Sequence, residues 1–317
     1  MKDVIIVGAG PAGLACAIEA ARKKLDYVVL DRGCVVNAIY NFPKNMTFFS
    51  TPDLLEIGET AFISDKFRPN RQEVLNYYLK IVKLFKLKTN TYEEAIGLSR
   101  HSNYLSVHAK TYSGKQKEYK ARKVILATGY YDNPNMIGVK GEDFSKVSHY
   151  YTEAHPFYNK EVAVVGGNNS AVEAALELCH HGAKVTLIHR EATLGKKIKY
   201  WILPDIKKRI EKKLVKAIFN ATVQEISREY IGIRINGKRS RVKNDFVFAM
   251  TGYRPDSKLM DAFGLKYNPK TLAPKHIPKN LETNIKGVHV AGSIISGINN
   301  NRVFIENSRD HGKVILG

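Results

Sequence analysis

Two segments of this 317-residue chain repeat the same order of apolar and polar positions. Each begins with an apolar run, VIIV at 4–7 and VAVV at 162–165, and continues into a glycine-rich turn, GAGPAG at 8–13 and GGNNSA at 166–171. A helix-compatible stretch and a second apolar run follow, ending at Asp31 in the first segment and at His189 in the second. This order predicts two βαβ units, at roughly 3–31 and 160–190.

The remaining periodicities predict the elements around these units. Helical spacing at 71–86 predicts a helix, and alternation near 89–110 and 117–126 predicts antiparallel strands. Further strands are expected at 221–226, 230–235, 245–250 and 287–292, with a terminal helix at 302–316. Ile206, Ile210 and Leu214 recur every four residues and predict an amphipathic helix through the lysine-rich stretch 207–216. The triplets ATG at 127–129 and MTG at 250–252 each follow an apolar strand, which indicates that the same dinucleotide-binding arrangement occurs twice in the chain.

The first glycine loop has the residues that a dinucleotide pyrophosphate requires. Gly8 permits a tight turn, Gly10 lets the backbone approach the phosphates, and Gly13 allows the helix to pack closely on the strand. The helix N-terminus, which includes Ala12, presents free N–H groups to the phosphates. Asp31, at the end of the second strand, suits the hydroxyls of a ribose.

The second loop is less regular. Gly166 begins it, Asn168 stands where a middle glycine is usual, and Ala171 replaces the third. Asparagine tolerates a positive φ better than other non-glycine residues, so we expect the turn to survive. Asn169 and Ser170 are expected beside the phosphates. His189 and Arg190 follow the second strand, and with Lys196, Lys197 and Lys199 nearby they favour a ribose 2′-phosphate, hence NADPH over NADH.

One chain with two different loops suggests two dinucleotides, a flavin and NADPH, and therefore a redox enzyme. We predict an α/β fold with two Rossmann-like domains, in which an FAD domain (1–130 and 253–317) is interrupted by an NADPH domain (131–252). The prediction places the boundaries in turns rich in Tyr, Asp, Asn and Pro.

Composition is ordinary for a globular protein, at 44% hydrophobic and 25% charged residues. The three cysteines form no CxxC pair and no zinc spacing, so we expect a reducing, cytoplasmic compartment and no metal. No apolar run suits a membrane span, and no nucleic-acid motif accompanies the net charge of +20. That charge reflects either solvated lysine faces or a field that attracts NADPH or an acidic partner protein.

Longer strings resemble a known family. These are YNFPKNMTFFSTPDLLEIG at 40–58, ATGYYDNPN at 127–135, GEDFSKVSHYYTEAHPFYN at 141–159, GGNNSAVEAALEL at 166–178, KYWILPDI at 199–206, TGYRPD at 251–256 and FIENSRDHG at 304–312. Together they resemble the thioredoxin-reductase-like group of two-dinucleotide flavoproteins, and within it the bacillithiol-disulfide reductase (YpdA/Bdr) family. The resemblance covers essentially the whole chain. It implies hydride transfer from NADPH to FAD and on to a low-molecular-weight disulfide, and it suggests a homodimer.

The chain departs from this group at its thiols. The slot of the thioredoxin-reductase CxxC is occupied by His149, Tyr150, Tyr151 and Thr152, and Ala12 stands where relatives carry a cysteine in GGGPCG. Cys16 and Cys34 remain as thiol candidates, although a small buried core role suits Cys16 better. His149, Glu153, His155 and His311 are candidate proton donors. An alternative acceptor is a small acidic protein, as in ferredoxin/flavodoxin–NADP reductases, which the missing thiols and the +20 charge favour.

The resemblance also implies where the flavin is held. Gly129, at the end of the ATG turn, is expected near FAD. Gly292 and Ser293 correspond to the Ala-Gly-Asp turn of the wider group, with a hydroxyl in place of the carboxylate. A helix beginning near Val303 and Phe304 is expected to direct its N-terminal amides at the flavin.

Overall fold

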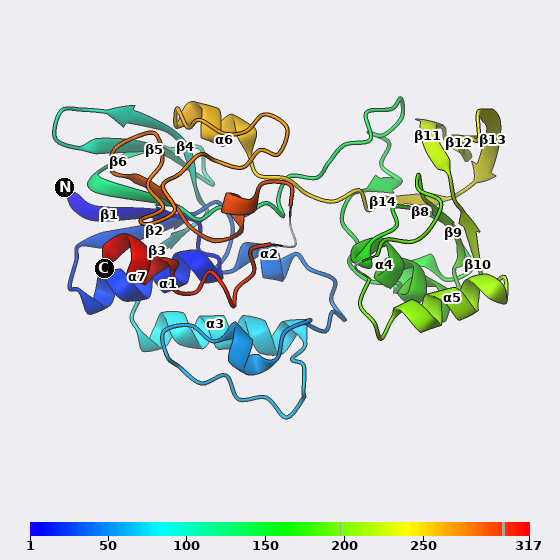
Figure 1. The fold of residues 1–317 in the computed structure, drawn as a ribbon, viewed down its shortest axis with the longest axis horizontal. Coiled ribbons are helices and arrows are strands. Elements are labelled where there is room, and N and C mark those ends of the chain that lie inside the picture. The colour runs from blue at the N-terminus through cyan, green and yellow to red at the C-terminus, as the bar shows by residue number, and fades with distance from the viewer. Residues whose placement is uncertain (197, 300–301) are drawn as a thin grey trace. The chain divides into compact units, whose positions relative to one another are not determined.

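The computed structural model describes residues 1–196, 198–299 and 302–317. The chain forms an α/β fold with two compact units, each built on a parallel sheet (Figure 1). The first unit comprises Met1–Asn41, Asn45–Asn133 and Tyr253–Gly317, and the second comprises Phe42–Lys44 and Pro134–Gly252. Among the described helices, none combines the length and the apolarity that crossing a membrane requires.

The first unit contains a mixed sheet in the order β3-β2-β1-β6-β5-β4, with β15 also paired to β6. Its strands are β1 (Lys2–Val7), β2 (Tyr27–Asp31), β3 (Thr89–Thr91), β4 (Glu93–Arg100), β5 (Leu105–Thr111), β6 (Gln116–Leu126) and β15 (Val288–Val290). β1 is parallel to both β2 and β6, whereas β4, β5 and β6 form an antiparallel meander. Residues 4–7 of β1 and 124–126 of β6 are buried and supply part of the core, which is why these two stretches read as continuous apolar runs.

The helices of this unit are α1 (Pro11–Arg22), α2 (Asn37–Tyr40), α3 (Arg71–Leu84), α6 (Ser257–Ala262) and α7 (His311–Leu316). Short 3₁₀ turns occupy Pro52–Leu55 and Gly292–Ser296. A capping box, in which Asn70 and Glu73 exchange side-chain to backbone hydrogen bonds, begins α3. The C-terminal helix α7 packs beside α1, as Figure 1 shows in red and blue.

The second unit contains a five-stranded parallel sheet in the order β10-β9-β8-β14-β7 and a separate antiparallel sheet, β11-β12-β13. Its strands are β7 (Val147–Ser148), β8 (Glu161–Val165), β9 (Lys184–Ile188), β10 (Val215–Ile218), β11 (Ala221–Ile226), β12 (Tyr230–Ile235), β13 (Lys238–Lys243) and β14 (Phe246–Ala249). Its α-helices are α4 (Asn169–His180) and α5 (Leu203–Glu211), and a 3₁₀ turn occupies His155–Phe157. α4 crosses from β8 to β9 and completes the second βαβ unit.

Most predicted elements are confirmed, including both βαβ units, the helix at 71–86 and the strands on either side of Ser113–Gly114. The prediction that the amphipathic helix continues through Leu214 is wrong. Helix α5 ends at Glu211, Lys213 adopts a left-handed φ of 58°, and Leu214 is half exposed. Strand β10 then begins at Val215. Strand β13 (KRSRVK) escaped prediction because its exposed cationic residues show no apolar alternation.

The predicted terminal helix is also wrong over its first part, since α7 begins only at His311. Residues before it form turns in which side chains take the backbone hydrogen bonds that a helix would use. Asn307 accepts a bond from the Phe304 amide (2.8 Å) and donates to the Arg302 carbonyl (2.8 Å). The Ser308 hydroxyl donates to the Phe304 carbonyl. Short polar side chains compete with helix formation in this way.

Candidate functional site

The first glycine loop connects β1 to α1 and has two positions that only glycine fits. Gly8 has φ of +109°, and a Cβ there would lie 2.5 Å from the Ala127 carbonyl oxygen. A Cβ at Gly13 would lie 1.9 Å from the Gly8 carbonyl oxygen. Gly8 therefore makes the tight turn, and Gly13 lets α1 approach it, as their spacing predicts.

Gly10 differs from its two neighbours in the motif because nothing crowds it. A Cβ at Gly10 would meet no atom within 4 Å, and its φ of −73° is open to any residue. Gly10 is also the N-cap of α1, and no side chain caps this helix. The backbone here offers N–H groups beside an open space that a side chain would fill, and this arrangement fits a pyrophosphate.

Asp31 is held in place at the end of β2. Its Oδ2 accepts the Ala9 amide (2.6 Å), and its Oδ1 accepts the Gly33 amide (2.8 Å). Burial raises the pKa of Asp31 above its usual value, although both amide bonds act in the opposite direction. Each carboxylate oxygen keeps acceptor capacity for a ribose hydroxyl.

Four other predicted residues of the first unit lie close together. Gly292 has φ of +74°, and a Cβ there would lie 2.6 Å from the Cβ of Ala12. Gly129 has φ of +65°, and its Cβ would lie 3.4 Å from the Ser293 hydroxyl. The turn at the end of β15 therefore meets the first glycine loop and the ATG turn.

Thr128, in this ATG turn, was not singled out from the sequence. Within the described residues its hydroxyl oxygen is buried and has no hydrogen-bond partner. A buried hydroxyl without a partner is costly, so a polar group of a bound ligand fits here. The repeated (Ala/Met)-Thr-Gly triplet was the sequence signal that pointed to it.

The expected flavin contact from Val303 and Phe304 is not supported in the form predicted. These residues do not begin a helix, and the Phe304 amide is bonded to Asn307. Phe304 is instead about half exposed. The helix-dipole argument for this segment therefore fails.

The second loop repeats the geometry of the first. Gly166 has φ of +145°, and its Cβ would lie 2.5 Å from the Met250 carbonyl oxygen, as that of Gly8 does from Ala127. Gly167 is constrained by a side chain instead, because its Cβ would lie 2.4 Å from the His189 ring. Asn168 has φ of −104°, so the expected positive φ is wrong. The middle position of the motif requires open space around the residue rather than a positive φ, and Asn168 adopts an ordinary extended backbone conformation.

Side chains of this loop bind the segment that follows β9. A Cβ at Gly195 would lie 2.1 Å from Asn168 Oδ1, and Asn169 Oδ1 accepts the Lys199 amide (2.8 Å). The Lys199 ammonium pairs with Glu173 (2.5 Å) and is mostly buried, so it is not displayed for a phosphate. Ser170 is exposed, Ala171 is buried, and Lys197 lies outside the described residues.

His189 and Arg190 differ in what they offer a nucleotide. Burial lowers the pKa of His189 below its usual value, so the ring is neutral at pH 7. The Arg190 side chain is 79% exposed, and its Nε lies 3.3 Å from the carboxylate of its neighbour Glu191. Arg190 is therefore the positive charge available at the end of β9.

The two thiol candidates lie in environments that disfavour a thiolate. Cys16 is completely buried in α1, and burial raises its pKa to about 12. Cys34 is half buried, and burial together with Asp31 raises its pKa. Its thiol donates to Asn37 Oδ1 (3.6 Å).

Two candidate proton donors of the second unit, His149 and Glu153, have structural partners. His149 Nε2 lies 3.3 Å from Glu142, whose carboxylate also accepts the amides of Ile137 (2.6 Å) and Gly138 (2.7 Å). Glu153 pairs with Lys44 (2.6 Å), and His155 begins a 3₁₀ turn.

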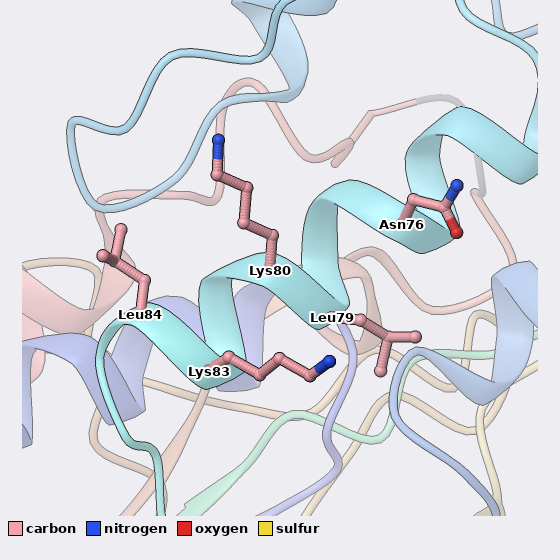
Figure 2. A pocket seen from close by; sticks show the side chains of 5 residues that line it. All are labelled: Asn76, Leu79, Lys80, Lys83 and Leu84. Atoms are coloured by element: carbon pink, nitrogen blue, oxygen red, sulfur yellow. The ribbon is translucent and has the colours of Figure 1, made fainter.

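A hollow of about 560 Å³ lies elsewhere, on α3. Its lining residues are Asn76, Leu79, Lys80, Lys83 and Leu84. Figure 2 shows all five side chains projecting from this single helix. None of them belongs to a glycine loop, so the hollow is separate from the candidate dinucleotide sites.

Comparison with known proteins agrees with this geometry. The profile of the family described as "Pyridine nucleotide-disulphide oxidoreductase" matches residues 5–292. Bacilliredoxin reductase Bdr of Bacillus subtilis is 41% identical over 98% of this chain and 95% of its own length.

Two solved structures are similar throughout. Bacillithiol disulfide reductase Bdr (YpdA) of Bacillus cereus has a TM-score of 0.97 at 39% identity, covering 99% of this chain and 97% of that one. The Staphylococcus aureus Bdr (YpdA) has a TM-score of 0.94 at 38% identity, covering 99% and 96%. The chain thus belongs to the pyridine nucleotide-disulphide oxidoreductase family, in its thioredoxin-reductase-like group, and is a flavin oxidoreductase whose cofactors are FAD and NADPH.

Proposed function

We propose that this enzyme uses NADPH to reduce a low-molecular-weight disulfide of the bacillithiol type, with FAD between donor and acceptor. One NADPH and one proton reduce one disulfide to two thiols, because the hydride carries two electrons and the second thiol takes the added proton. The observation that carries the proposal is a pair of matching glycine loops with different strand ends, Asp31 in the first and Arg190 in the second. The names of the relatives that match along the whole chain support the acceptor.

We assign FAD to residues 1–130 with 253–317, and NADPH to residues 131–252. In the first assignment the α1 N-terminus at Gly10 binds the pyrophosphate, and Asp31 accepts the adenosine ribose hydroxyls. Gly292 lies against Ala12 of the same loop, Gly129 lies beside Ser293, and these residues complete the proposed flavin site.

In the NADPH assignment, Asn168 and Asn169 with the exposed Ser170 surround the phosphates at the start of α4. Arg190 neutralises the 2′-phosphate, whereas neutral His189 packs on Gly167 and keeps the loop in shape.

When bound, FAD would supply a two-electron acceptor for the hydride of NADPH. The chain aligns the reactants and holds the loops in their shape. Neither Cys16 nor Cys34 has the environment of an activated thiolate, and Ala12 removes a thiol from the first loop. In this proposal neither Cys16 nor Cys34 relays electrons to the disulfide.

A second candidate acceptor is a small acidic electron-transfer protein. The net charge of +20 favours it, because a positive field steers an acidic protein toward the enzyme. In that case the reducing equivalents leave as single electrons.

Anaerobic acceptor assays separate the two proposals. NADPH should first bleach the bound flavin stoichiometrically, which establishes turnover-competent binding of both cofactors. Bacillithiol disulfide should then reoxidise the flavin and yield two thiols per NADPH, while flavodoxin and ferredoxin should not. Rapid reoxidation by flavodoxin with no thiol released would reject the disulfide proposal. The expected homodimer and cytoplasmic location remain predictions, the first open to light scattering.

A further inference from the structure

His311 lies where the C-terminal helix meets the first glycine loop. Its Nδ1 accepts the Gly292 amide (3.1 Å), and it is the first residue of α7. Gly292 is the left-handed residue whose Cβ would lie 2.6 Å from Ala12. A single imidazole nitrogen therefore joins α7 to the turn that rests on the loop assigned to FAD.

The hydrogen bond determines the state of the ring. A backbone amide can only donate, so Nδ1 must be unprotonated and His311 must be the neutral tautomer with the proton on Nε2. Protonation would place an N–H of the ring against the N–H of Gly292. That contact is repulsive, and it would also leave the Gly292 amide without its acceptor.

The surroundings favour the neutral ring. Burial is the largest influence on the pKa of His311 and lowers it, and His276 acts in the same direction. Asp310 and the backbone of Asn307 act in the opposite direction but do not overcome burial. Other charged groups near α7 are Lys313, which pairs with Asp310 (3.2 Å) and Glu59 (3.2 Å), and Lys123, whose ammonium donates to the Ile315 carbonyl (2.9 Å). On α1 they are Glu19, paired with Arg22 (2.9 Å), and Cys16, which is neutral.

The contact between helices leaves little room for adjustment. A Cβ at Gly312 would lie 2.9 Å from the Cα of Cys16 and 3.0 Å from the Ala15 carbonyl oxygen. Because α7 sits directly on α1, the His311 ring has little freedom to move away from Gly292. Loss of its bond therefore displaces the Gly292 turn rather than the helix.

We infer that His311 is a positioning residue for the flavin: its neutral ring holds the Gly292 turn against the first glycine loop, and protonation of the ring weakens FAD binding. This inference rests on the proposed assignment of FAD to the first unit. FAD binding and proton uptake at His311 then oppose each other, as linkage requires.

The direction in which FAD affinity changes with pH follows because a protonated His311 must lose one proton when FAD binds. Above the pKa of the apoprotein ring the affinity for FAD is constant. Below it the dissociation constant rises by up to about tenfold per pH unit, because one proton must leave for each FAD bound. The effect ends once the pH falls below the pKa of the FAD-bound ring.

The test is a titration of apoprotein with FAD at constant salt, between about pH 5 and about pH 8. Three proteins are compared: the natural chain, His311→Asn and His101→Asn. The asparagine oxygen occupies the place of Nδ1 and accepts the Gly292 amide at every pH. His101 is a matched control, since it contacts Ser106 on the β4–β5 hairpin instead.

His311→Asn should bind FAD within about threefold of the natural chain at the alkaline end and should lose the acid-dependent weakening. His101→Asn should keep that weakening. Any contribution from Asp31 is present in all three proteins and cancels in the comparison. The inference is overturned if His311→Asn weakens with acid as steeply as the natural chain does.

A second measurement needs no variant. Adding FAD to natural apoprotein in weak buffer near about pH 6 should release protons, and an indicator dye measures them. No release across the acid limb would overturn the inference. If FAD binds saturably at about pH 8 and Gly10→Ala weakens this binding, the assignment of FAD to the first unit is supported whatever the result at acid pH. Failure of the His311 inference can therefore be distinguished from failure of the FAD assignment.

Discussion

Gly10 and Gly13 belong to one motif, but the structure predicts opposite results when each becomes alanine. At Gly13 the new methyl carbon would lie 1.9 Å from the Gly8 carbonyl oxygen. This oxygen belongs to the backbone, so it cannot move aside by a change of rotamer as a side-chain atom could. Restoring ordinary contact requires a shift of about 1.5 Å between α1 and the loop. At Gly10 the methyl group would meet nothing.

The magnitudes follow from these contacts. Overpacking at Gly13 should cost about 3 kcal/mol, and the better helix propensity of alanine returns about 1 kcal/mol. The net loss of about 2 kcal/mol should lower the melting temperature of the apoprotein by about 4–8 °C. At Gly10 the loss of a favourable N-cap residue and the gain from a stiffer unfolded chain are each below about 1 kcal/mol and nearly cancel.

Binding should show the reverse order. The Gly10→Ala methyl group occupies the space proposed for the pyrophosphate, and losing charge-assisted amide bonds worth about 2 kcal/mol weakens FAD binding about thirtyfold. Calorimetry of the apoprotein and flavin titration measure the two effects separately. Gly97→Ala is the matched control, because its nearest atom is 3.8 Å away and it lies far from the loop in sequence.

Two results would refute this reasoning. Gly13→Ala apoprotein that melts with the natural protein would mean that the close approach of α1 to Gly8 is not a constraint. Gly10→Ala that binds FAD within threefold of the natural protein would mean that the open space is not the phosphate site.

Three further predictions concern the second loop and the thiols. Gly167→Ala should raise the KM for NADPH because its methyl group would collide with the His189 ring. Adding His189→Ala to this variant should return the KM to the natural value in steady-state assays. A KM that stays high in the double variant would contradict the contact. Arg190→Ala should raise the KM for NADPH about tenfold and leave that for NADH nearly unchanged, and an equal change for both would reject the 2′-phosphate role. With a pKa of about 12, Cys16 should resist alkylation at pH 8 in the folded protein, as peptide mass mapping would show, and Cys16→Ala with Cys34→Ser should retain disulfide turnover.

The repeated unit could be predicted because its physical causes are local. A buried parallel strand appears as an unbroken apolar run, and the turn after it needs glycine for a positive φ, as Gly8 and Gly166 show. Their close approach to the Ala127 and Met250 carbonyls could not be predicted from spacing alone, since those residues come from distant strands. The repeated Thr-Gly triplet indicated only that the strands were equivalent.

Predictions failed where side chains rather than periodicity decide the backbone. Residues 302–310 have helical spacing, yet Asn307 and Ser308 bond to the backbone and keep the segment in turns. Leu214 continues an apolar stripe on paper, but the helix has already ended at Glu211. At residues 302–310 a local competitor to the helix outweighs a weak periodic signal, whereas after Glu211 the left-handed φ of Lys213 breaks the helix.

Taken alone, the sequence determined the two βαβ units, the order of the glycines and the acidic or basic residue after each second strand, because these depend on short-range backbone and burial requirements. Only the tertiary structure decided that Cys16 is completely buried, that Lys199 pairs with Glu173, and that Gly292 and His311 meet the first loop. Each of these depends on contacts between residues remote in the chain, and the burial and partner that set a side chain's chemistry exist only once those residues are folded together.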